Sequence, residues 1–245
     1  MKLEIVIPSH GRPRLAAAAA ALFPSPLLVV AKNEEKGYAT VLPKARIAAH
    51  PNVKGLPMIR QWIMDNVDAD AIFMVDDDIF ECRSMTPTPP HVIEDPEDVL
   101  AIVRNCALNA REAGTICFWF LPKADPRFYH CDYPFQLTGT YKGWVQGFWR
   151  EEFNKHIRFD PRIRIKANID ISLRIARRYK FLWCDCRYAF NPRPHMTTAG
   201  GLSAVRTEAA LAADYEVLRQ KFGAAIQIDH KGKLENRLSV RGRRR

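Results

Sequence analysis

The chain has 245 residues, 47% of them hydrophobic and 10% aromatic, which is enough apolar sequence to build a sizeable folded core. This composition excludes a disordered chain, and no apolar run is long enough to cross a bilayer as a helix. The formal net charge of +10 favours an acidic or polyanionic partner.

Two features bear on the cellular compartment. Residues 15–23 are mostly alanine and follow two arginines, as in a signal peptide, but a strand-like run precedes them, so we predict a helix and no export. The six cysteines are scattered and form no CxxC pair, which disfavours a zinc site and favours a reducing cytoplasm.

The first part of the chain alternates short apolar runs with helical patterns. Apolar residues at positions 56, 59, 63 and 67 have the spacing of an amphipathic helix. Such alternation predicts a parallel sheet with right-handed crossovers. The predicted elements are strands over residues 3–7, 27–30, 45–49 and 71–75 and helices over residues 15–23 and 56–66.

The second part continues the pattern after a proline-rich loop over residues 86–90. Asp95 and Pro96 are typical N-cap and N1 residues of a helix that continues to about residue 113, and Asn168 is the predicted cap of a later one. Residues 122–147, rich in aromatics, predict a hairpin or an irregular lid. The remaining predictions are strands over residues 115–121 and 181–190 and helices over residues 168–179 and 207–222.

Three consecutive carboxylates, Asp76, Asp77 and Asp78, end the apolar run 71–75. Adjacent anions repel one another unless a cation lies among them, and hard divalent ions prefer oxygen ligands that they share with a substrate's phosphates. The carboxyl end of a strand is also where open α/β sheets bind ligands. The triplet therefore predicts a metal–diphosphate site, with an acidic turn that only ends a strand as the alternative.

The charge is concentrated at the C-terminus. Residues 231–245 carry seven cations against Glu235 alone, a net charge of +6. A basic terminal arm is a recurrent means of holding nucleic acid by its phosphates, although such arms also serve only for solubility. With no internal repeat, we predict one domain over residues 1–226 and a basic tail over residues 227–245.

The order of these parts resembles the GT-A fold glycosyltransferases, the nucleotide-diphospho-sugar transferases. The resemblance covers roughly residues 3 to 200 and implies an α/β domain with a mixed, mostly parallel sheet flanked by helices. It rests on the Pro-Ser-His-Gly-Arg-Pro loop, Arg60 on the helix that precedes the triplet, the triplet itself, Gly-Phe-Trp-Arg at 147–150, the helix with Asp170 and Arg174, and His195.

The resemblance implies a divalent ion, Mn²⁺ or Mg²⁺, and a UDP-sugar donor. Asp76 and Asp78 match the D-x-D motif that binds ribose and metal, and a histidine after the last core strand, here His195, commonly completes the metal shell. An ordinary loop histidine is the alternative for His195. The donor site implied by the match consists of Pro8, Ser9, His10, Arg12, Lys54, Arg60, Asp76 and Asp77.

The resemblance also implies a base and an acceptor site. Asp170 occupies the position of the base in inverting members, where the helix dipole keeps a first-turn carboxylate ionised. Ile169 precedes it, so the usual acidic pair is single, and a simple helix-terminal charge is the alternative. Aromatic faces stack on sugars and on bases, although such rings are also common in cores. The acceptor residues implied by the match are Trp144, Gly147, Trp149 and Arg150.

Within the group, the opening Ile-Pro-Ser-His-Gly-Arg-Pro and the Val-Asp-Asp-Asp-Ile run are most similar to the phage glycosyltransferases associated with TET-type hydroxylases. This similarity implies 5-hydroxymethylpyrimidine in DNA as acceptor, which must leave the base stack to react, and the cytoplasm of an infected bacterium as location. The alternatives are a transferase for polysaccharide or lipid-linked acceptors and a non-catalytic DNA-binding protein on a transferase-like fold. A nucleotidylyltransferase is disfavoured because the first loop lacks a glycine-rich phosphate cradle.

Overall fold

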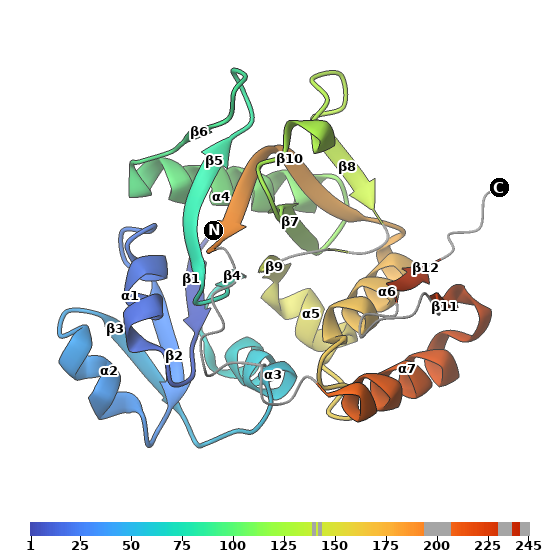
Figure 1. Cartoon of the computed structure of the whole chain (residues 1–245), viewed down its shortest axis with the longest axis horizontal. Helices are drawn as coiled ribbons and strands as arrows, with labels where there is room; N and C mark the ends of the chain where they lie inside the picture. Colours follow the sequence, from blue (N-terminus) through green and yellow to red (C-terminus); the bar gives the residue numbers. More distant parts are fainter. Residues whose placement is uncertain (139–140, 142–143, 194–206, 230–236, 241–245) are drawn as a thin grey trace.

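The computed structural model describes residues 1–138, 141, 144–193, 207–229 and 237–240, and all statements on the structure refer to them. A ten-stranded mixed sheet runs through the molecule, with helices against it (Figure 1). Its strands are β1 (Leu3–Pro8), β2 (Leu27–Ala31), β3 (Arg46–His50), β4 (Ala71–Val75), β5 (Ile79–Ser84), β6 (His91–Val92), β7 (Cys117–Leu121), β8 (Phe135–Thr138), β9 (Val145–Trp149) and β10 (Leu182–Pro192). The helices are α1 (Pro13–Ala20), α2 (Glu35–Val41), α3 (Leu56–Asn66), α4 (Pro96–Glu112), α5 (Arg150–His156), α6 (Ala167–Tyr179) and α7 (Glu208–Phe222).

The sheet has a parallel half and a largely antiparallel half. The strand order is β3-β2-β1-β4-β9-β7-β10-β5-β6, with β8 also paired to β10. β3, β2, β1 and β4 are parallel to one another, as the alternation of strands and helices predicts. β9 is antiparallel to both β4 and β7, and β5 is antiparallel to β10, so the sheet is less parallel than predicted. Among the described residues, no α-helix lies between β4 and β5 or between β7 and β9, so these connections are not the helical crossovers that usually join parallel strands.

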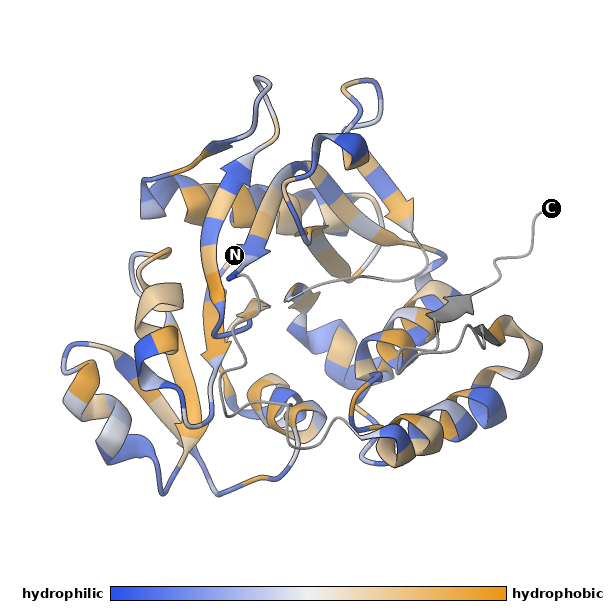
Figure 2. Ribbon diagram, in the orientation of Figure 1, coloured by the Kyte–Doolittle hydropathy of each residue, from blue (hydrophilic) through white to orange (hydrophobic). Residues whose placement is uncertain are grey.

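The core lies at the centre of the sheet, where the strands are strongly hydrophobic (Figure 2). Phe73 of β4 contacts the rings of Phe118, Phe120 and Phe190, with centroids 5.9, 5.7 and 5.7 Å away. β4 is buried along its whole length, which explains why its sequence is a continuous apolar run and not an alternating one.

Local signals fix most helix ends. The Asp95 side chain accepts a hydrogen bond from the Glu97 amide at 2.9 Å and so caps α4, as predicted. The prediction that Asn168 caps α6 was wrong, because the N-cap is Lys166. The carboxylate of Asp214 on α7 accepts the amides of residues 164, 165 and 166 at 2.7 to 2.9 Å, so a distant residue satisfies this helix start.

Several elements were not predicted. β5, β6 and α5 lie in segments without a clear periodicity, and the aromatic segment contains β8 and, with its last residues, β9. At the C-terminus, β11 (Ile226–Asp229) and β12 (Arg237–Val240) form a two-stranded antiparallel sheet within the predicted tail. None of the described helices combines the length and apolar character that crossing a membrane requires.

Candidate functional site

The triplet lies in a tight turn at the carboxyl end of β4. The Asp76 amide donates to the Trp144 carbonyl at 2.9 Å, and the Asp76 carbonyl accepts the Ile79 amide at 3.2 Å. β1 and β4 are parallel neighbours, so the loop that follows Pro8 emerges at the same edge as the triplet. Two segments about 65 residues apart in sequence therefore meet at one edge of the sheet, which is the usual ligand position in an α/β fold.

Asp77, the middle carboxylate, points at the first loop. It accepts a hydrogen bond from the Ser9 hydroxyl at 2.6 Å, and the Arg12 guanidinium lies 3.4 Å away. Only 8% of Asp77 is exposed, and this burial raises the pKa of its carboxyl group, although both partners oppose the rise. Asp77 therefore joins the triplet to the first loop and presents little surface to a ligand.

Asp76 is held by Arg60 of α3. The guanidinium approaches the Asp76 carboxylate at 2.8 Å, so the helix before the triplet directs an arginine at it. Desolvation raises the pKa of Asp76 to about 6, with further contributions from Asp78 and Asp77, while Arg60 acts in the opposite direction. Arg60 therefore does not fully compensate the charge of Asp76, and a further cation beside this carboxylate would be stabilising.

A buried polar chain continues from Arg60 toward α6. With its amide nitrogen directed at the Tyr141 hydroxyl, Gln146 donates to that hydroxyl and accepts from Arg60 Nε at 2.8 Å. The Tyr141 amide in turn donates to the Ser172 hydroxyl of α6 at 3.0 Å. Burial raises the pKa of Tyr141 well above its usual range; the Arg60 charge opposes this rise, and Asp76 and Asp170 add to it. Tyr141 therefore lies within electrostatic range of both the triplet and Asp170.

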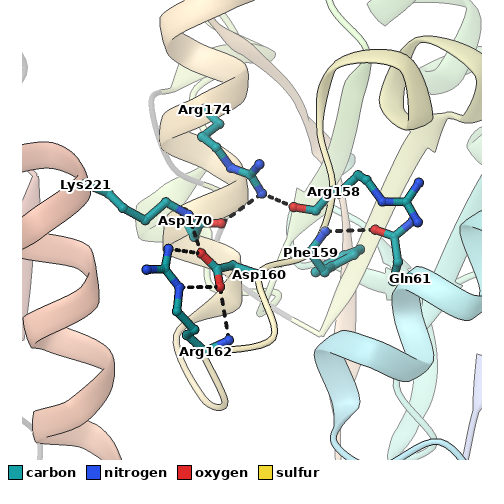
Figure 3. Close-up of polar contacts among 8 residues, drawn as sticks. All are labelled: Gln61, Arg158, Phe159, Asp160, Arg162, Asp170, Arg174 and Lys221. Atoms are coloured by element: carbon teal, nitrogen blue, oxygen red, sulfur yellow. Dashed lines mark hydrogen bonds and ion pairs between the residues drawn. The ribbon is translucent and has the colours of Figure 1, made fainter.

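Asp170 lies in the first turn of α6, as predicted, but in a closed ionic cluster (Figure 3). One carboxylate oxygen is 2.9 Å from Arg174, and the other contacts Lys221, which extends from α7. Lys221 also lies 3.0 Å from the carboxylate of Asp160, whose other partner is Arg162. The Asp170 residue is 1% exposed, so a ligand reaches its carboxylate only if one of the two cations moves.

Three polar residues of this region carried no sequence signal of function. Lys221 is a last-turn cation of α7, a common position for lysine, and Gln146 and Tyr38 belong to runs that predict only helix or strand. Tyr38 of α2 is 2% exposed, and its hydroxyl contacts both the Ser9 hydroxyl and the Arg12 amide. Only the tertiary structure brings these side chains to the site.

The remaining predicted donor residues, Pro8, His10 and Lys54, lie around the same edge. Pro8 ends β1, and His10 is exposed and lies 3.0 Å from Glu34. Lys54 is exposed in the connection between β3 and α3. His195 lies outside the described residues, but the Arg193 amide donates to the Asp78 carbonyl at 2.9 Å, so the chain passes the triplet two residues earlier.

The structure separates the four predicted acceptor residues. The Trp144 carbonyl accepts the Asp76 amide, which places Trp144 beside the triplet. Gly147 lies in the middle of β9 against Phe118, and an added Cβ would be 2.1 Å from that ring. Trp149 pairs with Ala71 at the opposite end of β4 and is 3% exposed. Arg150 follows it and donates to the Met64 carbonyl at 2.9 Å. Of the four, only Trp144 is brought to the triplet.

The donor set of the triplet fits a hard divalent ion. Among the described residues, no three His, Cys, Asp or Glu side chains form a preassembled metal site. Mg²⁺ and similar ions usually take one or two carboxylates and complete their shell with substrate phosphate and water. Asp76, with its raised pKa, and Asp78 beside it supply such oxygens, so the residues present are chemically suited to this role.

Solved structures of other proteins share this architecture. Neither a protein-family model nor a curated protein matches the sequence. Solved structures similar to 89–90% of this chain are S. aureus TarS 1–349 (TM-score 0.57, 10% identity), GalNAc-T7 with UDP, GalNAc and Mn²⁺ (0.58, 11%) and the mannosyltransferase PcManGT from Pyrobaculum calidifontis with GDP-Man and Mn²⁺ (0.57, 11%). The match spans 64%, 48% and 64% of those chains, respectively. The fold of this protein is therefore the GT-A fold.

Proposed function

We propose that this protein is a divalent-metal-dependent glycosyltransferase, which moves a sugar from a nucleoside-diphosphate sugar to a hydroxyl group. The observation that carries the proposal is the triplet at the end of β4, joined to the first loop through Asp77 and to α3 through Asp76. Two of the structures with the same fold contain a nucleotide together with Mn²⁺, which supports the binding of a nucleotide and a metal ion at the edge of the sheet that carries the triplet.

In this reaction the acceptor oxygen attacks the anomeric carbon while the bond from that carbon to the diphosphate oxygen breaks. A metal ion held by Asp76 and Asp78 would neutralise charge on the departing diphosphate. Arg12 lies at the same edge and adds positive charge near the leaving group. Asp170 is the proposed base that takes the acceptor proton, which requires one of its oxygens to leave Arg174 or Lys221.

We further propose a UDP-sugar as donor and 5-hydroxymethylpyrimidine in DNA as acceptor, with the cytoplasm of a bacterial host as location. The support is the resemblance of the first loop and triplet to phage enzymes, together with the net charge of +10. A DNA acceptor presents a dense row of phosphates, which a basic protein binds through counterion release. The competing acceptors are polysaccharide and lipid-linked hydroxyls, and the competing function is DNA binding without catalysis.

One incubation tests donor, reaction and acceptor together. DNA containing 5-hydroxymethylcytosine or 5-hydroxymethyluracil is incubated with the protein, Mn²⁺ and a panel of UDP- and GDP-sugars. The DNA is then digested to nucleosides, and their masses are measured by mass spectrometry. We expect a nucleoside heavier by one hexose or N-acetylhexosamine with a UDP-sugar. Release of nucleoside diphosphate without a heavier nucleoside would keep the transferase and reject these DNA acceptors.

The non-catalytic alternative makes the opposite prediction. A DNA-binding protein would release no nucleotide from any donor, while its salt-dependent DNA affinity would remain. Deletion of residues 231–245, which carry a net charge of +6, is expected to weaken DNA binding and to reduce its salt dependence without changing slow donor hydrolysis. Unchanged DNA affinity after this deletion would contradict a role of the tail in holding the acceptor.

A further inference from the structure

The buried hydroxyl of Tyr38 links three separate parts of the site. Tyr38 is on α2, between β2 and β3, and is 2% exposed. Its oxygen accepts the Arg12 amide at 3.0 Å and lies 2.7 Å from the Ser9 hydroxyl. Ser9 in turn donates to the Asp77 carboxylate at 2.6 Å. Four groups from α2, the first loop and the end of β4 thus form one continuous hydrogen-bonded row.

The direction of each hydrogen bond follows from counting hydrogens. An ionised Asp77 only accepts, so the single hydroxyl hydrogen of Ser9 is committed to it. Tyr38 must therefore donate its own hydrogen to Ser9, and its oxygen is left to accept from the Arg12 amide. Every donor has one acceptor in this row, and no second arrangement satisfies all of them. Burial also raises the pKa of Tyr38, which keeps its hydroxyl protonated and able to donate.

The row fixes both the loop and the carboxylate. Ser9 is also held through its amide, which donates to the Val29 carbonyl of β2 at 3.0 Å. Gly11 has a φ of +67°, a left-handed conformation that glycine adopts without strain, and this turn carries the Arg12 amide to the Tyr38 oxygen. Without the tyrosine hydroxyl, Ser9 would lose its donor and the Arg12 amide its acceptor inside a buried region.

We propose that Tyr38 is a positioning residue of the donor site, which acts through Ser9 and Arg12 to hold Asp77 and the first loop in the arrangement that binds the nucleotide diphosphate. The inference rests on the proposed function, because that function makes the first loop and the triplet the binding site of the nucleotide-sugar donor. Tyr38 does not itself touch the donor, since its hydroxyl is enclosed by its two partners.

A tyrosine that serves only as core would behave differently. Its ring fills space between α2 and the sheet, and phenylalanine fills the same space. The Tyr38→Phe variant therefore removes the hydrogen-bonded row and keeps the packing. Tyr215 of α7 is a matched control, because it is also buried, with 4% exposed, and takes no part in the row.

The test is calorimetric titration of UDP and GDP in the presence of Mn²⁺ into the full-length wild type, Tyr38→Phe, Tyr215→Phe, Ser9→Ala and the Tyr38→Phe/Ser9→Ala double variant. We expect Tyr38→Phe to bind the preferred nucleotide about tenfold more weakly, the usual consequence of leaving buried hydrogen-bonding groups unpaired. Tyr215→Phe should bind as the wild type does. The loss in the double variant should be smaller than the sum of the two single losses, because Tyr38 acts in part through Ser9.

A second measurement does not depend on any nucleotide. Hydrogen exchange of the Arg12 amide, followed by NMR in the free protein, should be faster in Tyr38→Phe than in the wild type, because that amide loses its acceptor. Unchanged exchange together with wild-type nucleotide affinity would overturn the inference, as would additive losses in the double variant. If the wild type bound neither nucleotide, the proposed function would fail, and the exchange rate of Arg12 would still decide whether Tyr38 positions the loop.

Discussion

The triplet and the Asp170 cluster handle buried negative charge in opposite ways. At the triplet, burial and mutual repulsion raise the pKa of Asp76 to about 6, although Arg60 is 2.8 Å away. Asp170 is buried at least as deeply, but a cation faces each of its oxygens, one from Arg174 and one from Lys221. The charge of Asp76 is incompletely compensated, whereas a cation faces each oxygen of Asp170.

Because of this difference, the triplet is suited to binding a cation, whereas Asp170 is suited to accepting a proton only after an ion pair opens. Additional positive charge would stabilise the triplet, and in the proposed reaction a divalent ion bound with the diphosphate would supply that charge. The Asp170 cluster gains nothing from a further cation, and its carboxylate accepts a proton only after an ion pair opens. Lys221 is the partner on a different helix, α7, so a shift of α7 changes Asp170 without unfolding α6. Under the proposed function, the triplet could therefore bind its ligand as it stands, whereas Asp170 could act as base only after one of its ion pairs opens.

The largest effect is expected from Asp170→Asn. If Asp170 takes the acceptor proton, this change should reduce sugar transfer about 10²–10⁴-fold, because an amide cannot act as the base. The affinity for nucleotide and Mn²⁺ should remain, since that site is at the triplet. Transfer is measured by mass spectrometry of the product and affinity by calorimetry. Wild-type transfer by this variant would show that the cluster serves only to fix α7.

A control separates chemistry from misfolding in that experiment. Asp170→Asn leaves Arg174 and Lys221 facing a neutral group, and removing one member of a buried pair is destabilising. Asp160→Asn removes the other carboxylate of the cluster, 3.0 Å from Lys221, without touching the proposed base. Asp160→Asn should lose stability in urea and keep transfer at temperatures below its unfolding transition. Equal loss of transfer in both variants would assign the effect to the cluster and not to Asp170.

The matching change at the triplet is Asp78→Asn. We expect it to weaken Mn²⁺-dependent nucleotide binding at least about 100-fold, because even the outer partners of metal ligands contribute 10- to 100-fold in affinity. Calorimetry with and without Mn²⁺ measures the metal-dependent part separately. Affinity equal to the wild type would remove Asp78 from the metal site. Loss of binding here and loss of transfer at Asp170 would together establish the contrast between the two regions.

The third prediction concerns Gly147 of β9 and tests whether this strand belongs to the acceptor site or to the core. Gly147→Ala would place a Cβ 2.1 Å from the Phe118 ring, between two central strands, and overpacking of this kind costs about 1–3 kcal/mol of unfolding free energy. Gly37→Ala is the matched control, because its Cβ meets no atom within 4 Å, so the substitution should be neutral or slightly stabilising. Urea denaturation measures both. A Gly147→Ala protein of wild-type stability with lowered acceptor affinity would contradict the core assignment.

Much of this fold is predictable because its signals are local. The bounds of α3 and β4 follow from apolar spacing and a continuous apolar run, and α4 is marked by Asp95 at its start. The cap of α6 was assigned incorrectly, because the N-cap is Lys166 and the segment that leads into the helix is held by Asp214, about 50 residues away. Long-range partners of this kind have no signature in a single sequence.

The residues of the candidate site likewise fall into those with a local sequence signal and those without one. The triplet is visible because three adjacent carboxylates are chemically unusual, and Arg60 because it lies on the helix just before them. Tyr38 and Lys221 are ordinary residues whose importance comes from the groups they meet in the folded chain. Trp149 was assigned to the acceptor site, together with Trp144, by the family resemblance, but Trp144 precedes the five-residue strand β9 and Trp149 is its last residue.

The smallest effect is expected from His50, which is buried at the end of β3 without a counter-ion. Its Nδ1 accepts the Val53 amide at 3.0 Å, so the ring is neutral, and burial lowers its pKa below 6.5, with Glu34 opposing the shift and His10 adding to it. The unfolded chain therefore binds a proton at His50 at a higher pH than the folded protein does. The stability from neutral His50 is complete above pH 6.5 and is lost as pH falls through that value.

His50→Gln keeps an acceptor for Val53 and should flatten the decline in urea midpoint between pH 7 and 5.5. Because Asp76 and Asp77 are common to both proteins, their titration cancels in the difference, and parallel curves would show that His50 is not the group that responds.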